Sequence, residues 1–423
     1  MNRYLTAEVF VPGGMPEHTY VPRTDRRLEE HLGAAKAHLC KLVTVTGATK
    51  SGKTVLTTRV FPRSENIWVD GGAVGSEDDF WSYILDKIDG YTHRGLEDTS
   101  ESALGIEGSL EAEGGIPLVA KGKGHLGSRF DRTLSKRQSR SLSLAAKPAA
   151  VSQLQSTRIP LIIDDFHYLD RSLQGRIVRA LKSLIFEGIP VILIAIPHRR
   201  YDAVKVEREM TGRLEPIAVP MWNQGELTQI AQEGFPLLNI GVTDQVCGHL
   251  AAESYGSPHL MQDFCRELAY THGVAETVHE AITIDRVPST LFSKVAENTG
   301  RVIFEKLARG PRQRRDRVQR QLKDGGTADI YQVILKALAK LQPGLETIDY
   351  EVLRSSIREI VVVEHVPAAH EVTRVLEKMA EIAAEDEAST PVMDWEREDR
   401  RLHITDPFFA FYLKWGSTTT SRP

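Results

Sequence analysis

The residues best suited to chemistry lie in one glycine-rich segment, Gly47 to Thr54, which matches the pattern G-x-x-x-x-G-K-[ST] in full. Glycines permit backbone torsions that other residues resist. Successive N–H groups can then converge on phosphate oxygens at the start of a helix. In this pattern Lys53 would bridge the β- and γ-phosphates of a nucleotide, and Thr54 would offer its hydroxyl to Mg²⁺. We expect the nucleotide to contact Gly47, Thr49, Lys50, Ser51, Gly52, Lys53, Thr54 and Val55.

A pair of aspartates, Asp164 and Asp165, follows the apolar run Leu161-Ile162-Ile163. A carboxylate at the carboxyl end of a buried strand beside the phosphate loop can hold Mg²⁺, and Asp164 has that place. Asp165 could polarise the attacking water. Glutamate does this more often, so the shorter side chain favours slow turnover. The alternative is that Asp165 caps a helical turn over 166–169.

A cationic segment ends another apolar run. Pro197-His198-Arg199-Arg200 follows the residues 191–196. A guanidinium there would face the γ-phosphate and could distinguish ATP from ADP through a charge-assisted contact. The alternative is two solvated arginines, and the sequence does not choose between Arg199 and Arg200.

Continuous apolar runs separated by helical patterns predict a parallel sheet covered on both faces. The expected strands are 42–46, 67–69, 161–163, 191–196 and 217–219. The long separation between Lys53 and Asp164 leaves room for an intervening strand. We therefore expect an α/β P-loop core with an extra strand between the two motifs, rather than a nucleotide kinase or a GTPase.

Four segments follow from the patterns. Residues 1–222 would form the core, interrupted by an insertion over 101–150, whose part 121–147 carries eight Lys/Arg and one acid. Residues 223–285 look all-helical, and residues 223–300 would form a lid. Residues 301–325 would form a basic linker helix, with eight Lys/Arg and one acid over 306–323. Residues 326–416 show three helical patterns and a hairpin, which is the pattern of a winged helix.

Composition excludes several classes. The chain has 423 residues, 41% hydrophobic and 26% charged, with a formal charge of -4, so neither a disordered chain nor a wholly basic nucleic-acid coat is expected. The sequence has no run of 18 apolar residues, so no membrane span is expected. Its first residues lack the apolar region of a secretory signal, so secretion is not expected. Cys40, Cys247 and Cys265 lie far apart, which fits neither a disulfide framework nor a zinc site and favours a cytoplasmic location.

Taken together, the sequence resembles the AAA+ and STAND P-loop ATPases, especially the prokaryotic ATPases related to origin-recognition initiators. The resemblance rests on the phosphate loop, the 161–165 strand, the strand ending at 198–200, the terminal winged-helix pattern with its closing 404–412 segment, Val21-Pro22-Arg23 and Gly256-Ser257-Pro258. It implies a switch in which Val21 and Arg23 lie by the adenine and Pro258 touches the nucleotide from the lid. ATP binding would then close the lid and permit assembly. Asp165 stands where these enzymes usually have Glu, and His259 stands beside Pro258 where a lid arginine is expected, so a slow switch fits better than a motor.

Three functions are compatible with these patterns. The first is an ATP- and Mg²⁺-dependent switch ATPase with a homo-oligomeric or protein partner. The second is a DNA-associated regulator of the initiator or transposition-helper kind. The third is a P-loop kinase, which the extra strand and the winged-helix pattern disfavour. The stretch 371–387 has six acids and two bases and would repel DNA, which favours protein or interdomain contacts for this domain. If the protein binds DNA, the contact would come from the 306–323 stretch, through Arg312, Arg314 and Arg315, or from the 121–147 arm. A solvated face or an acidic partner is the alternative for the 306–323 stretch.

Overall fold

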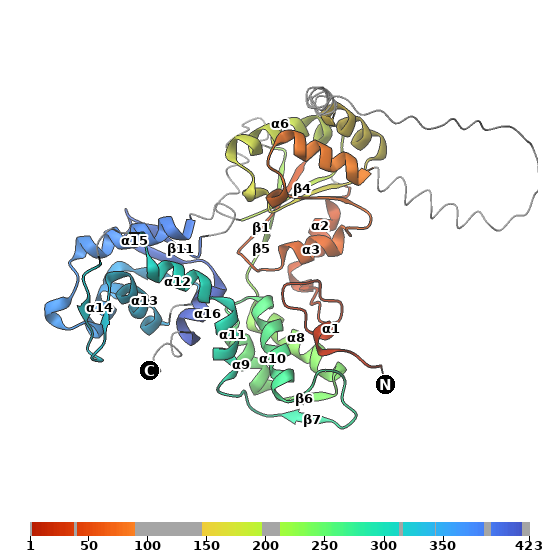
Figure 1. Ribbon diagram of the computed structural model, residues 1–423. Helices are drawn as coiled ribbons and strands as arrows, with labels where there is room; N and C mark the ends of the chain where they lie inside the picture. Colours follow the sequence, from red (N-terminus) through yellow and green to blue (C-terminus); the bar gives the residue numbers. More distant parts are fainter. Residues whose placement is uncertain are drawn as a thin grey trace, which may run out of the picture.

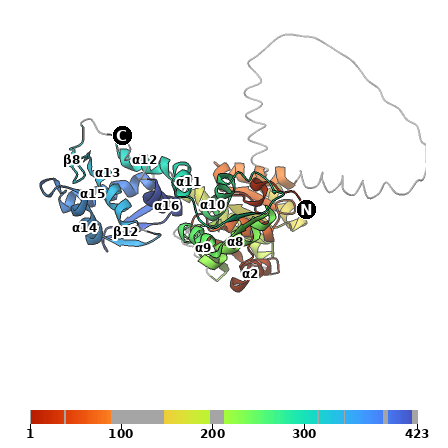
Figure 2. The same cartoon turned by 90° about the horizontal axis from the view of Figure 1, so that it is seen from below.

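The computed structural model describes residues 2–37, 40–88, 146–196, 212–312, 316–342, 344–384 and 391–416. These residues form an α/β unit, a helical unit below it and a C-terminal unit beside the helical one (Figure 1). The perpendicular view keeps α12 to α15 to one side of the other two units (Figure 2). Most of the 101–150 insertion, the 121–147 arm up to residue 145, and Arg199, Arg200, Arg314 and Arg315 lie outside the described residues.

A five-stranded sheet forms the centre of the α/β unit. Its strands are β1 (Leu42–Gly47), β2 (Ile67–Asp70), β3 (Leu161–Asp164), β4 (Val191–Ala195) and β5 (Leu214–Val219). They are parallel and lie in the order β2-β3-β4-β1-β5. β4 therefore separates β1 from β3, and the predicted extra strand between the two motifs is confirmed. β1 to β4 agree with the predicted apolar runs because their core positions are apolar and buried. β5 begins three residues before its predicted run and is only partly buried, because it lies at the edge of the sheet.

Helices cover both faces of the sheet, as expected. On one face, α6 (Arg171–Phe186) packs with the helical residues 77–88 and 146–157. On the other face lie α2 (Leu28–Ala34) and α3 (Lys53–Val60), with Leu32, Leu56 and Phe61 in the core (Figure 1). Short turns η1 (Thr24–Arg26), η2 (Gly71–Ala73) and η3 (Phe166–Tyr168) connect these elements.

The helical unit contains α8 (Gln224–Leu237), α9 (Asp244–Glu253), α10 (Pro258–Thr271) and α11 (Leu291–Thr299). The expectation that 223–285 is wholly helical is wrong, because β6 (Ile240–Val242) and β7 (Ile282–Ile284) form a short parallel pair. The N-terminal segment, with α1 (Thr6–Val9), also belongs to this unit: Val9, Phe10 and Val21 share its core. A Cβ on Gly234 would collide with the Phe10 ring, so this close approach requires glycine.

The C-terminal unit begins with α12 (Arg301–Arg309). The predicted basic helix over 306–323 is wrong beyond Arg309, because Gly310 has φ 60° and Pro311 follows it. The remaining elements are β8 (Arg320–Gln321), β9 (Thr327–Ala328), α13 (Ile330–Leu341), β10 (Thr347–Asp349), α14 (Tyr350–Ile360), η6 (Val363–His365), α15 (Ala369–Ala384), β11 (Met393–Glu396), β12 (Arg401–Ile404) and α16 (Pro407–Trp415). The helices α13 to α15 and the β11–β12 hairpin lie where the sequence placed three helices and a hairpin. β10 adds a third strand in the order β10-β12-β11.

Helix α16 belongs to two hydrophobic cores. Phe411 and Tyr412 pack in the core of the helical unit, whereas Phe409 and Leu413 pack in that of the C-terminal unit. The two units are therefore joined through one shared helix. None of the described helices is long and apolar enough to cross a membrane.

Candidate functional site

The predicted phosphate loop connects the end of β1 to the start of α3. Gly52 caps α3 with φ 89°, a left-handed torsion that glycine adopts at little cost. A Cβ on Gly47 would lie 2.5 Å from the carbonyl oxygen of Val219, so the loop fits against β5 only with glycine at its start. The loop thus ends at a helix N-terminus, where backbone N–H groups are available to an anion.

Lys53 is held inside this loop. Its Nζ donates hydrogen bonds to the carbonyl oxygens of Gly47 at 2.9 Å and Ala48 at 2.8 Å. Burial lowers the pKa of Lys53 to about 8, although the nearby carboxylates of Asp165 and Asp164 act in the opposite direction. A phosphate group would offer this ammonium a stronger, charged acceptor than the two carbonyls.

Thr54 and Asp164 meet beside the lysine. The Thr54 hydroxyl donates to Asp164 Oδ1 at 3.3 Å, and the backbone N–H of Asp165 donates to the same oxygen at 3.0 Å. Burial and the neighbouring Asp165 raise the pKa of Asp164 to about 6. A hydroxyl and a carboxylate oxygen are ligands that suit Mg²⁺, which keeps waters and phosphate oxygens in its remaining positions. The described residues contain no cluster of three or more His, Cys, Asp or Glu that could hold a metal by themselves. The donor set therefore fits a metal that arrives with a nucleotide.

Asp165 has a strained backbone. Its φ is 50°, which is uncommon for a residue other than glycine, and its side chain makes no capping bond to η3. The capping interpretation is therefore wrong. Burial and the carboxylate of Asp70 raise the pKa of Asp165. Asp70 pairs in register with Asp164 across β2 and β3, so the three acids gather at the carboxyl edge of the sheet.

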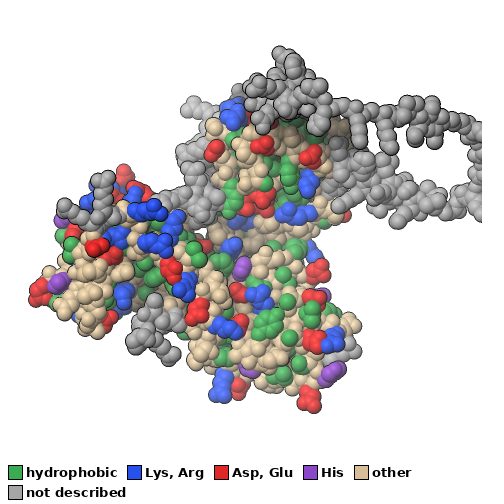
Figure 3. All heavy atoms as spheres, viewed as in Figure 1, with side chains coloured by type: hydrophobic (Ala, Val, Ile, Leu, Met, Phe, Trp, Pro, Cys, Tyr) green, Lys and Arg blue, Asp and Glu red, His purple; other side chains and the backbone are tan. Residues whose placement is uncertain are grey.

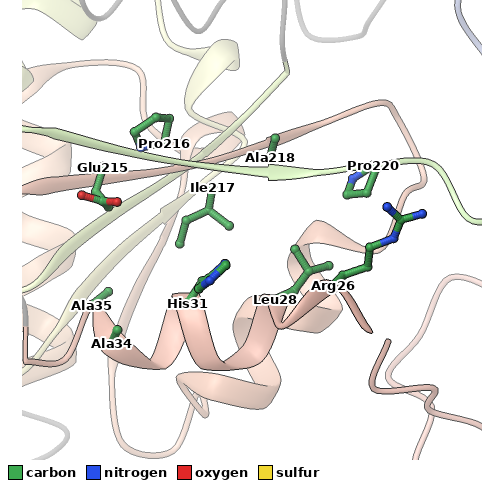
Figure 4. A pocket seen from close by; sticks show the side chains of 10 residues that line it. All are labelled: Arg26, Leu28, His31, Ala34, Ala35, Glu215, Pro216, Ile217, Ala218 and Pro220. Atoms are coloured by element: carbon green, nitrogen blue, oxygen red, sulfur yellow. The ribbon is translucent and has the colours of Figure 1, made fainter. Parts of the chain in front are cut away.

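A cleft of about 920 Å³ connects the sheet edge to the helical unit and the start of the C-terminal unit. Its lining includes Val21, Arg23, Thr49, Lys50, Ser51, Gly52, Lys53, Thr54, Val55, Asp164, Asp165 and Pro258. The structure thus brings these predicted residues together around one space. A second cavity, of about 510 Å³, lies between α2 and β5, and none of these predicted residues lines it (Figure 4).

Arg23 is buried, and its guanidinium already has protein partners. It donates to the carbonyl oxygens of Pro220 at 3.1 Å and Met221 at 3.3 Å, and its Nε lies 3.2 Å from Glu226. Arg23 therefore ties the segment before α2 to the connection between β5 and α8. The charged group of Arg23 is therefore bound to protein partners at this junction, although the residue also lines the cleft as expected.

Two residues at the site escaped the sequence patterns. The indole N–H of Trp222 donates to the Ser51 carbonyl at 2.9 Å. The guanidinium of Arg63 lies 3.8 Å from Asp164 Oδ2 and 4.3 Å above the ring centre of Trp68. Neither residue belongs to a recognisable motif. The sequence indicates their role only through their place in the chain: Trp222 follows β5, and Arg63 follows α3.

The beginning of α16 approaches the loop from the C-terminal unit. Lys50 Nζ lies 5.7 Å from the ring centre of Phe408, and the His259 ring lies 4.9 Å from the same ring. Burial, followed by the charges of Lys50 and Arg266, lowers the pKa of His259 to about 4. His259 is therefore neutral at pH 7 and does not supply the cation that a lid arginine would.

No protein-family model and no curated protein matches the sequence. Among solved structures, the chain is similar to the Walker-type ATPase of Pyrococcus abyssi, with a TM-score of 0.52 and 14% identity over 96% of this chain and 99% of that one. It is also aligned with Cdc6p of Pyrobaculum aerophilum (TM-score 0.42, 12% identity, 98% of both chains) and with Orc1 of Aeropyrum pernix in complex with DNA (TM-score 0.42, 15% identity, 97% of this chain and 96% of that one). At these identities the likeness shows the fold alone. The α/β P-loop NTPase fold, expected from the sequence, is confirmed.

Proposed function

We propose that the protein is a nucleotide-controlled switch of the AAA+/STAND type, which binds ATP with Mg²⁺, hydrolyses it slowly and couples its nucleotide state to assembly or partner binding. One observation carries the proposal: the hydrogen bond from Thr54 to Asp164 beside the loop-bound ammonium of Lys53. An ammonium suited to phosphate and two oxygens suited to a metal lie together at one edge of the sheet, which supports the proposal.

The site residues have separate roles in this mechanism. Lys53 exchanges its bonds to the loop carbonyls for bonds to the β- and γ-phosphates. Thr54 and Asp164 would hold Mg²⁺, which neutralises phosphate charge when bound. Asp165 accepts the proton of the water that attacks the γ-phosphorus, so that the bond to the leaving ADP oxygen breaks and phosphate is released. Its burial and raised pKa suit a proton acceptor.

The proposed segments are a core over 1–222, whose N-terminal residues pack in the helical unit, a lid over 223–300, a linker over 301–325 and a winged-helix domain over 326–416. The connection through α16 supports coupling between the last two. Lys414 Nζ and Trp415 Nε1 donate to the buried carboxylate of Glu253 at 2.6 and 2.8 Å. A lid that closes on the nucleotide would therefore carry the C-terminal unit with it, changing the surface offered to a partner.

Substitution of the loop lysine tests the assignment. Lys53→Ala should abolish ATP binding in calorimetric titrations while its circular dichroism stays that of the wild type. Lys336→Ala, which removes an exposed lysine from α13, is the matched control and should bind as the wild type does. Unaltered ATP binding by Lys53→Ala would contradict the proposal.

A DNA-associated regulator is the second candidate. Lys and Arg side chains gather over α12 and α15 on the face seen in Figure 3, and Arg312 is exposed. However, Arg317 and Arg320 have internal partners: they pair with Asp329 at 2.7 Å and Glu371 at 2.9 Å. The basic stretch thus offers fewer free charges to phosphates than its sequence suggests.

Two experiments separate the candidates. ATP-dependent retention on duplex DNA that is lost when Arg312, Arg314 and Arg315 are changed to Ala would favour the regulator. Its absence, together with nucleotide-dependent changes in particle size without DNA, would favour the switch. For the P-loop kinase, release of free phosphate from ATP without an added acceptor would count against transfer to a substrate.

A further inference from the structure

Trp222 lies in the connection between the sheet and the helical unit, after β5 and before α8. Three contacts fix it there. Its backbone N–H donates to the carbonyl oxygen of Gly256 at 3.2 Å, its indole N–H donates to that of Ser51 at 2.9 Å, and the Arg23 guanidinium lies 4.9 Å from its ring centre. One residue therefore links the phosphate loop and Arg23, through its side chain, to Gly256, shortly before α10, through its backbone.

The bond to Ser51 fixes the direction of a phosphate donor. The Ser51 carbonyl and the Gly52 N–H belong to one peptide group, and the described chain has no cis peptide bond. In a trans peptide the C=O and the N–H point in opposite directions. Because the carbonyl points to Trp222, the Gly52 N–H points away from it, at the N-terminus of α3. A free peptide group would rotate among several directions, and only some of them suit an anion.

We propose that Trp222 is a positioning residue for phosphate binding. It holds the Ser51–Gly52 peptide with the Gly52 N–H directed at the phosphates, and it ties that orientation to the position of the lid. This inference rests on the proposed function, because it concerns the same nucleotide site.

The surroundings of Trp222 support the link to the lid. Arg23 fastens the neighbouring residues Pro220 and Met221 through their carbonyl oxygens. On the other side, Gly256 has φ 71°, and a Cβ there would lie 3.2 Å from the Trp222 carbonyl. The position of the indole therefore depends on the position of the junction between β5, α8 and α10. A lid movement that shifts this junction must carry the indole or break its bond to Ser51, and either result changes the phosphate loop.

Trp222→Phe tests the inference, because it keeps a ring and removes the N–H donor. Three ligands separate the effects: ADP, pyrophosphate, which lacks the base, and adenosine, which lacks the phosphates. We expect ADP and pyrophosphate to bind about ten-fold more weakly, equivalent to about 1.4 kcal/mol, with adenosine unchanged. Trp81→Phe is the matched control, because it also removes an indole donor, the one to Glu77, at a residue that does not line the cleft, and it should leave pyrophosphate affinity unaltered.

Equal weakening of adenosine and ADP, or no weakening of pyrophosphate, would overturn the inference. If the wild type binds neither ADP nor pyrophosphate, the proposed function itself falls, and this inference falls with it. A second measurement avoids dependence on the folding of the variant. The wild type, labelled with 5-fluorotryptophan, has five tryptophans, and Phe variants at the other four assign the Trp222 resonance. That resonance should shift when pyrophosphate is added, and an unmoved resonance would also overturn the inference.

Discussion

The Thr54 hydroxyl donates to the Asp164 carboxylate at 3.3 Å, although Thr54 is the second residue of α3 and Asp164 is the last residue of β3. The strand β1, which leads into α3, is not a neighbour of β3 in the sheet, because β4 lies between them. The contact is made by side chains that reach across the carboxyl edge of β4. Under the proposed function, these two oxygens are ligands for a metal that arrives with the nucleotide.

Asp164→Asn tests the metal role directly. The amide keeps the size of the side chain and its bond with Thr54, but it loses the negative charge that attracts Mg²⁺. We expect ADP to bind the variant with nearly the same affinity with and without Mg²⁺, whereas the wild type should bind more tightly with the metal. Calorimetric titrations in Mg²⁺ and in EDTA measure this difference. Asp349→Asn, at an exposed acid of the C-terminal unit, should keep the wild-type response, and a full Mg²⁺ effect in Asp164→Asn would contradict the metal assignment.

Asp165→Asn separates hydrolysis from binding. If the carboxylate accepts the proton of the attacking water, its amide removes that function and leaves the phosphate contacts in place. Hydrolysis should fall by about 10²- to 10⁴-fold, the usual contribution of a general base. ATP affinity should change little. Phosphate release over time and ATP titrations give the two quantities, and a variant that hydrolyses at the wild-type rate would exclude Asp165 as the base.

The pH dependence of Mg²⁺-ADP binding follows from two shifted groups. Burial lowers the pKa of Lys53 to about 8, so the free protein loses this positive charge, and phosphate affinity, as the pH rises through that value. Burial and Asp165 raise the pKa of Asp164 to about 6, so the metal ligand is protonated as the pH falls through that value. Affinity should therefore be highest between these two values and fall on both sides.

Titrations from about pH 5 to about pH 9 measure this profile. In EDTA, the fall on the acid side should become smaller, because Asp164 then has no metal to bind. In Lys53→Arg, the fall on the basic side should disappear, because a guanidinium keeps its proton throughout this range. A profile without a maximum would contradict both assignments.

Arg63 should modulate the metal site through charge. Its guanidinium lies 3.8 Å from Asp164 Oδ2 but is 58% exposed, so solvent screens much of the interaction. Removal of this cation in Arg63→Ala should raise the apparent affinity for Mg²⁺ in the presence of ADP by about two- to three-fold. Arg63→Lys keeps the charge and should resemble the wild type. Weaker Mg²⁺ binding in Arg63→Ala would instead mean that Arg63 helps to assemble the site.

The sheet and the phosphate loop could be predicted because each leaves a local signal. Strands buried on both faces must be apolar throughout, and the loop before Lys53 needs glycine at fixed positions. The contacts of Trp222 and Arg63 leave no such signal. Each depends on where a connecting segment places one side chain in space, and neighbouring residues in the sequence do not determine that.

The basic stretch shows a different limit. The pattern of 306–323 predicts a basic helix, yet Gly310 ends α12, and Arg317 pairs with Asp329. A single glycine with a left-handed torsion outweighed the helical preference of the residues around it. Likewise, β6 and β7 are too short for their pattern to differ from that of the adjoining helices.

Glu253 should govern how firmly the C-terminal unit is attached to the helical unit. Its buried carboxylate accepts hydrogen bonds from Lys414 and Trp415 at the end of α16. Glu253→Gln keeps the shape but leaves Lys414 without its counter-charge, so the free energy of unfolding should fall by about 1–3 kcal/mol. Glu305→Gln, which breaks the exposed ion pair with Arg301, should change the free energy of unfolding far less, because solvent screens that pair. Urea denaturation measures both free energies.

Limited proteolysis tests whether Glu253 also transmits lid movement. If it does, ATP should protect the α11–α12 connection from cleavage in the wild type but not in Glu253→Gln. Equal protection in the two proteins would show that α16 transmits the movement through its aromatic contacts alone.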